Sequence, residues 1–105
     1  MSLVPHLLAL IAEPRRQEIL RLIWDSELAA GDIAANVDVT FGAVSQHLRL
    51  LRDANAVSMT KRGRHHFYRA NKTTLGPLAQ HLESIWHGQL LQLKHFAEAE
   101  EQNRG

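Results

Sequence analysis

Apolar residues recur every three or four positions in several segments of the chain, which is the spacing of an amphipathic helix. This pattern predicts helices over residues 3–12, 14–25, 30–36 and 40–54, and a long last helix over residues 74–98. Most of the chain is therefore expected to be helical.

The helix predicted over residues 40–54 has the clearest division between its two sides. Val44, Leu48 and Leu51 repeat at four and three residues and are expected to face the core. Thr40 precedes them and is the expected N-cap. The opposite side carries the polar residues Ser45, Gln46, Arg49 and Arg52.

The one segment with the pattern of strands follows this helix. Residues 57–61 and 65–70 predict two strands, and Arg62-Gly63 predicts the turn of a hairpin, because glycine readily adopts a positive φ. A lone hairpin needs a helical layer to rest on. The whole order predicts a winged helix-turn-helix, a mainly α fold with a small β-hairpin wing over residues 57–70.

The length of 105 residues fits one domain, which we expect over residues 1–98. Thr73 or Thr74 is the expected cap of the last helix, with Pro77 in its first turn. Residues 99–105 are polar and are expected to form a tail.

The composition excludes several kinds of chemistry. The chain has no cysteine, so disulfides, thiolate metal sites and thiol nucleophiles are excluded. Ser45 and His47 do not face each other on a helix, and the chain shows no paired acids in an evident pocket and no glycine-rich phosphate loop. We therefore expect no enzyme and no cofactor. Without a signal-peptide pattern or a long apolar run, a cytoplasmic protein with no membrane partner is expected.

The formal net charge of +1 conceals an uneven distribution of charge. Residues 41–72 carry seven Lys and Arg against Asp53 alone, while the segments before and after them are acidic. Such a basic block is typical of a surface that binds a polyanion, although a solvated basic face without a partner gives the same pattern. Because the block coincides with the 40–54 helix and the wing, double-stranded DNA is the favoured partner.

Residues of this helix and wing have side chains suited to DNA binding. Ser45 and Gln46 can read base edges, and arginine can pair with phosphate or guanine. His47 is expected on the DNA face, the alternative being a histidine packed at the edge of the core. The predicted DNA-binding residues are Thr40, Phe41, Ser45, Gln46, His47, Arg49, Arg52, Lys61, Arg62, Arg64 and His66.

Four segments, taken together, resemble the ArsR-type winged helix-turn-helix repressors of bacteria and archaea. They are Glu13-Pro14-Arg15-Arg16 leading into Ile19-Leu20, then Glu27-Leu28, residues 44–51 and residues 63–68. The resemblance covers roughly residues 5–90. It implies a homodimeric transcriptional repressor that binds a pseudo-palindromic operator and releases it when a metal, another ligand or an oxidation event shifts the dimer.

The resemblance places the dimer interface on the first and last helices. The composition agrees, since 45% hydrophobic residues and two mostly apolar terminal helices predict more apolar surface than one small core can bury. The predicted interface residues are Leu7, Leu8, Ile11, Leu78, Leu82, Ile85, Gln89 and Leu93.

Three positions depart from the family's pattern. Ala29 and Gly31 stand where its thiolate metal sensors have cysteines, so that metal site is excluded. Phe41 stands where the family often has glutamine at the start of the recognition helix. Asn55 replaces a glycine after that helix, and asparagine still tolerates the left-handed conformation.

Seven histidines raise the possibility of a metal-responsive repressor. The weak candidate ligands on the last helix are His81, Glu83, His95 and Glu98. The first two sit one residue away from the family's spacing, and one residue turns a helical side chain by about 100°. Solvated surface histidines are therefore favoured, and no metal is predicted.

Three further roles stay open from the sequence. The chain could be a winged-helix module that docks a protein on its basic face. Arg16 could hold its helix to the wing or to DNA, or form a surface ion pair. Aromatic residues could line a pocket for an unknown small-molecule effector, although core packing is favoured. These aromatic residues are Trp24, Phe67, Tyr68, Trp86 and Phe96.

Overall fold

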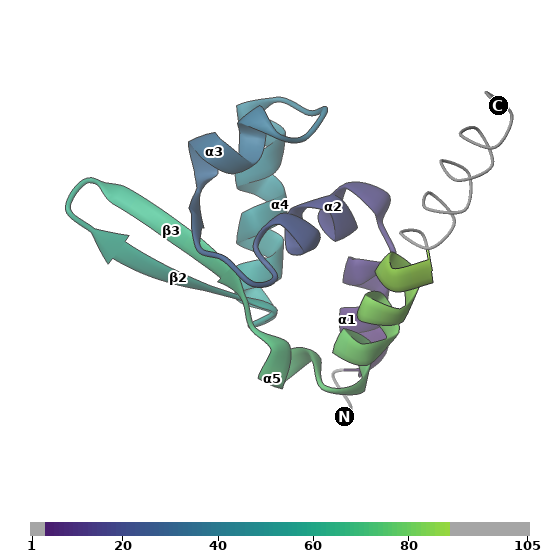
Figure 1. Cartoon of the computed structure of the whole chain (residues 1–105). Helices are drawn as coiled ribbons and strands as arrows, with labels where there is room; N and C mark the ends of the chain where they lie inside the picture. Colours follow the sequence, from purple (N-terminus) through teal and green to yellow (C-terminus); the bar gives the residue numbers. More distant parts are fainter. Residues whose placement is uncertain (1–3, 89–105) are drawn as a thin grey trace, which may run out of the picture. The chain divides into compact units, whose positions relative to one another are not determined.

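The computed structural model describes residues 4–88, which belong to two compact units that divide between Leu75 and Gly76. The elements of the first unit are α1 (Val4–Ile11), α2 (Pro14–Leu22), β1 (Leu28–Ala29), α3 (Ala30–Ala35), α4 (Phe41–Asp53), β2 (Val57–Arg62), β3 (His65–Ala70) and α5 (Lys72–Leu75). In the second unit, residues 77–88 are helical. The described chain is mainly helical with a small antiparallel sheet, and the β2–β3 hairpin extends away from the helices of the first unit (Figure 1).

Helix α4 follows its prediction closely at both ends. Thr40 is the N-cap, because its Oγ1 accepts a hydrogen bond from the amide of Ala43 at 3.1 Å. The helix ends at Asp53, and Asn55 has a φ of 61°, the left-handed conformation expected there. The recognition-helix candidate is therefore bounded by its own local sequence.

One face of each main helix of the first unit forms the core. Val44, Leu48 and Leu51, the stripe expected to face inward, are all buried. The other fully buried large side chains of this unit are Ile11, Ile19, Leu20, Ile23, Ile33 and Leu75.

Helix α2 is shorter than the predicted span of residues 14–25. It ends at Leu22, and Ile23 is its C-cap. The carbonyl of Ile23 accepts a hydrogen bond from the amide of Ala70 at 2.9 Å. Because that carbonyl is bound to the end of β3, the chain leaves the helix at this point.

The sheet has three strands in the order β1-β3-β2, so the prediction of a lone hairpin is incomplete. Strand β1 pairs with β3 through Leu28 opposite Tyr68 and Ala29 opposite Phe67. Two residues are too few to show a period in the sequence. The short strand ties the wing to the segment that enters α3.

The hairpin turn lies one residue later than predicted. Arg62 pairs with His65, so the two turn residues are Gly63 and Arg64. Gly63 has a φ of 61°, whereas Arg64 has a negative φ, the combination found in a type II′ turn. Arg64 therefore occupies the tip of the wing.

The last helix is not continuous, which corrects the prediction of one helix from residue 74. The amide of Thr74 donates to Asn71 Oδ1 at 3.3 Å, so Asn71, and neither threonine, caps the short helix α5. Gly76 then has a φ of 55°, which interrupts the helix before residue 77. No helix in the described part of the chain is long and apolar enough to span a membrane.

Candidate nucleic-acid interface

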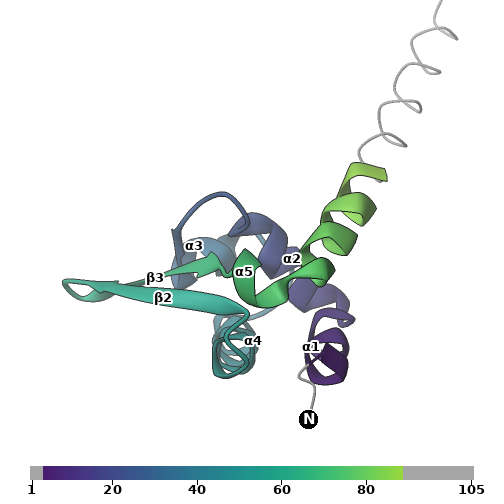
Figure 2. The ribbon, with the colours of Figure 1, turned by 90° about the horizontal axis from the view of Figure 1, so that it is seen from below.

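The surface of α4 opposite the core is polar and open. Ser45, Gln46, Arg49 and Arg52 are all exposed, as their side of the helix predicts. Phe41, at the first position of the helix, is 58% exposed. The stripe that holds α4 to the core thus leaves a row of solvent-facing side chains on the opposite side. The β2–β3 hairpin extends past this helix (Figure 2).

The wing presents one face toward α4. His66 and Tyr68 are two residues apart on β3 and share that face, and Lys61 pairs directly with His66 on β2. Ser45 of α4 and Tyr68 of the wing both line the same two clefts. Phe67 points to the other face of β3, so Phe67 and Tyr68 cannot line one pocket.

Two clefts adjoin this meeting point. One, of 310 Å³, lies between the start of α4 and the tip half of the wing, and it is lined by Phe41, Arg64 and His66 among others. The second, of 490 Å³, lies further along α4 and is lined by Arg49, Arg52 and the α4 residues around them. Together they form a concave, basic surface between the helix and the wing.

The cations of this surface differ in how far they are already neutralised. Within the described residues, Arg49, Arg52, Lys61 and Arg64 make no ion pair. Their charges are available to an anionic partner.

Arg62 differs from these four cations. Its Nη2 donates to the carboxylate of Glu27 at 2.9 Å, and its guanidinium lies 5.3 Å from the centre of the Phe67 ring. The sequence did not point to Glu27 as part of the site, because 35 residues separate it from Arg62. Only the pairing of β1 with β3 brings the two together.

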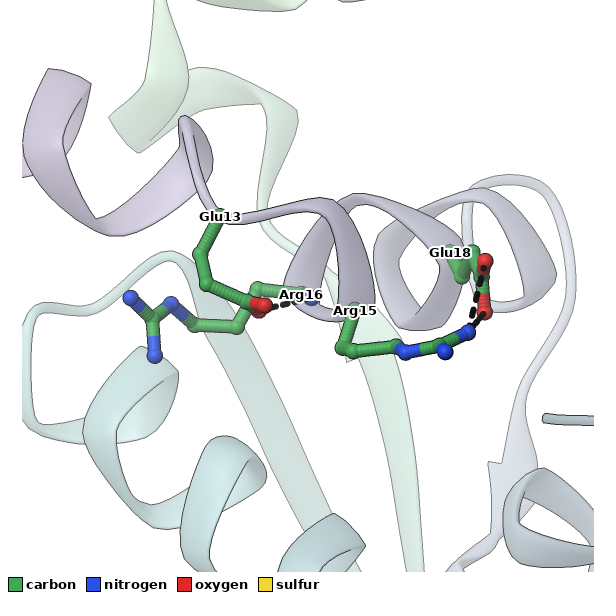
Figure 3. A network of polar contacts seen from close by, with 4 residues as sticks. All are labelled: Glu13, Arg15, Arg16 and Glu18. Atoms are coloured by element: carbon green, nitrogen blue, oxygen red, sulfur yellow. Dashed lines mark hydrogen bonds and ion pairs between the residues drawn. The ribbon is translucent and has the colours of Figure 1, made fainter. Parts of the chain in front are cut away.

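Glu13 was named from the sequence only within a family-like segment, and the structure gives it a capping role. Its carboxylate accepts a hydrogen bond from the amide of Arg16 at 2.9 Å and so caps α2 (Figure 3). Burial acts to raise the pKa of this carboxyl, whereas hydrogen bonds from the backbone amides of Arg16 and Arg15 act to lower it. With the nearby charges of His47 and Arg16, they hold the pKa of Glu13 below its ordinary value.

Arg16 connects three helices. Its Nε donates to the carbonyl of Leu10 at 2.6 Å, and its Nη1 lies 3.3 Å from Nδ1 of His47 in α4. The neighbouring Gln17 donates to the carbonyl of Ile11 at 2.7 Å, so α2 supplies caps for the end of α1. Among the described residues, no hydrogen bond or ion pair joins the side chain of Arg16 to the wing or to a carboxylate. His47 is half-buried.

The structure describes only some of the residues predicted for the dimer interface and for a metal site. Leu7 and Ile11 are buried, whereas Leu8 is 47% exposed. Leu78, Leu82 and Ile85 share one face of the helix over residues 77–88, by their spacing of four and three. The other predicted interface and metal residues, Gln89, Leu93, His95 and Glu98, lie outside the described residues, as does Phe96.

His81 and Glu83 are exposed, and the described residues contain no group of three potential metal ligands.

Trp24 is buried, with the ammonium of Lys72 5.2 Å from its ring centre. Its surroundings are those of a core residue.

Comparison with known proteins finds a matching family and several relatives of this chain. Residues 13–58, which include α2, α3 and α4, match the family described as bacterial regulatory protein, arsR family. The transcriptional repressor SdpR of Bacillus subtilis (strain 168) is 34% identical over 65 residues, or 62% of this chain and 72% of that protein.

The transcriptional activator HlyU of Vibrio cholerae is 30% identical over 80 residues, or 76% of this chain and 74% of that protein. A solved structure of reduced HlyU from Vibrio cholerae N16961 aligns with a TM-score of 0.67 at 30% identity. That alignment covers 76% of this chain and 84% of the other. The similarity therefore extends through the fold as well as the helices of the matched segment.

Proposed function

The chain belongs to the ArsR family of bacterial regulatory proteins and is a DNA-binding transcriptional regulator, and we propose that it represses transcription as a homodimer on a palindromic operator. In this proposal α4 enters the major groove and the β2–β3 wing contacts the adjoining backbone. The observation that carries the proposal is the pair of adjoining clefts between α4 and the wing, which are lined by Arg49, Arg52 and Arg64.

The dimensions and chemistry of DNA suit this surface. The major groove is about 12 Å wide and admits one helix. Gln46 and Arg49, exposed on the outer face of α4, are assigned to base edges, and Ser45 to the base edge or phosphate nearest the wing. Arg52, Lys61 and Arg64 are assigned to phosphates, because their positive charges can pair with phosphate oxygens, and such contacts position the protein without reading sequence.

SdpR is named as a repressor and HlyU as an activator, so the family likeness allows either direction of regulation. Occupation of an operator blocks polymerase without any further device, which favours repression as the simpler outcome. Leu8, exposed on α1, is the surface residue that we assign to the dimer contact in the first unit.

Selection of bound sequences from random DNA tests the core of the proposal. An enriched palindrome is expected, with half-sites about 34 Å apart or a multiple of that distance. Gln46→Ala and Arg49→Ala should change the base preference by roughly 1–3 kcal/mol for each lost contact. Arg15→Ala, on α2, is the matched control and should leave the preference unchanged. Failure to enrich any sequence would overturn the proposal.

Sedimentation of the free protein tests the dimer. Leu8→Glu places a charge on the exposed part of α1 and should shift the chain to a monomer with weaker operator binding. A wild-type chain that sediments as a monomer and still selects a palindrome would contradict the assigned interface. A half-site without symmetry would contradict the dimer altogether.

A further inference from the structure

Phe41 is the most exposed of the large apolar side chains in the described part of the chain, at 58% against 47% for Leu8 and 38% for Leu50. A single exposed apolar residue is common on protein surfaces, so exposure alone says little. The position of Phe41 is the informative feature. It is the first residue of the helix proposed to enter the major groove.

The local structure holds Phe41 in place on that surface. The Thr40 cap fixes the first turn of α4, and Ser45 lies four residues further along the same side of the helix. Phe41 and Ser45 line the 310 Å³ cleft together with Arg64 and His66 of the wing. An apolar ring thus stands among groups that bind base edges and phosphates.

The position of the Phe41 ring on this surface limits which group of the DNA it can contact. The edges of the bases in the major groove present hydrogen-bond donors and acceptors, with one apolar group, the C5-methyl of thymine. The polar neighbours of Phe41 can form hydrogen bonds with phosphates and with the other base edges, whereas the ring cannot. We propose that Phe41 determines sequence specificity by packing on a thymine methyl group in each half-site of the operator.

This inference rests on the proposed function, and its test uses the operator that the selection experiment yields. Each thymine in one half-site is replaced in turn by deoxyuridine, which removes the methyl group and leaves the pairing and hydrogen-bonding groups unchanged. Affinity is measured by fluorescence anisotropy for the wild-type chain and for Phe41→Ala. Wild-type binding should weaken about fourfold at one thymine, the effect of one buried methyl group.

Phe41→Ala should bind the thymine and deoxyuridine operators equally at that position. Leu50→Ala removes another exposed apolar side chain of α4 and should keep the wild-type discrimination. Because Phe41 is exposed, thermal melting of Phe41→Ala should match that of the wild type, which separates loss of contact from loss of fold.

Two results would overturn the inference and leave the regulator function standing. In the first, deoxyuridine weakens the binding of Phe41→Ala as much as that of the wild type. In the second, replacing any thymine by deoxyuridine leaves the affinity of the wild type unchanged. A Phe41→Ala chain that binds DNA normally but sediments differently would instead assign the ring to a protein contact. If the selection enriches no sequence, the proposed function itself fails, and the inference fails with it.

Discussion

The guanidinium Nη1 of Arg16 lies 3.3 Å from Nδ1 of His47, and this contact joins the start of α2 to the middle of α4. The contact pairs a guanidinium, which can only donate hydrogen bonds, with a ring nitrogen of the histidine. Since Arg16 also binds the carbonyl of Leu10, one side chain links α1 to the helix proposed to read DNA. Arg16 therefore adds a polar tie to α4 beside the apolar packing of Val44, Leu48 and Leu51.

Arg16→Ala is expected to lower the free energy of unfolding by about 1–3 kcal/mol, because the Leu10 carbonyl loses a charge-assisted hydrogen bond. Arg16→Lys should recover only part of the loss, since an ammonium lacks the planar fork that serves Leu10 and His47 together. Urea denaturation measures both variants. Arg15→Ala is the control, and an equal loss there would contradict the role given to Arg16.

Glu13→Ala should lower the free energy of unfolding at pH 7 by about 0.5–2 kcal/mol, the usual value of an N-cap side chain. The folded protein holds the pKa of Glu13 below its ordinary value of 4.5. The contribution of the carboxylate is therefore complete above pH 4.5 and is lost as the pH falls through the lower, folded-state pKa. Denaturation of both proteins between pH 7 and pH 3 should show their difference shrinking on the acid side.

Glu18→Ala is the matched control for the Glu13 experiment. Its carboxylate pairs with Arg15 at 3.3 Å, with the two side chains 48% and 40% exposed. Such an exposed pair is worth little, about 0–1 kcal/mol. A pH dependence in Glu18→Ala as large as that in Glu13→Ala would mean that capping of α2 is not the cause.

Glu27→Gln should strengthen binding to DNA of any sequence. The substitution removes a negative charge beside the wing and releases Arg62 from its ion pair, so Arg62 becomes available to a phosphate. The slope of log affinity against log salt should steepen by up to about 0.9, the value for one more phosphate contact. Anisotropy titrations at several salt concentrations measure this slope.

The double variant Glu27→Gln/Arg62→Ala should lose the gain, because no cation is left to be released. If Glu27→Gln alone weakens binding, then Glu27 serves to hold Arg62 in its binding position. Stronger binding by Glu27→Gln would mean that Glu27 competes with DNA for Arg62, and weaker binding would mean that Glu27 positions Arg62.

Gly42→Ala should stabilise the fold and weaken DNA binding. Gly42 is in the first turn of α4, and a Cβ added there would meet only Thr40 Oγ1, at 4.0 Å. Alanine is therefore accommodated and should raise the free energy of unfolding by up to about 0.5–1 kcal/mol. The added methyl group would occupy the space into which DNA approaches α4. Thermal melting and operator titration measure the two effects, and unchanged affinity would show that the start of α4 stays clear of the DNA.

The periodic parts of the fold were predictable from neighbouring residues. The Thr40 cap, the buried stripe of Val44 and Leu48, and the left-handed Asn55 all depend on interactions within a few residues. The sequence also placed the basic side chains on α4 and on the wing, because strand and helix periods assign residues to faces. Most of the candidate DNA surface could be predicted on this basis.

Two of the errors arose where distant segments meet. Residues 28–29 carry no strand period, and they form β1 only because β3 lies beside them. Helix α2 stops at Leu22 because the carbonyl of Ile23 is bound by Ala70. The break before residue 77 is local, since Gly76 has a positive φ, but the run of leucines on either side of it suggested one continuous helix.

By itself, then, the sequence determined a mainly helical chain with a capped, two-sided helix followed by a basic hairpin, because side-chain periodicity and capping act over short separations. The tertiary structure alone decided which charged groups are available to bind DNA and which are already engaged in contacts within the protein. It pairs Arg62 with Glu27 and brings Arg16 to His47, across 35 and 31 residues of chain. Such contacts depend on how the elements pack, and no local pattern of residues encodes them.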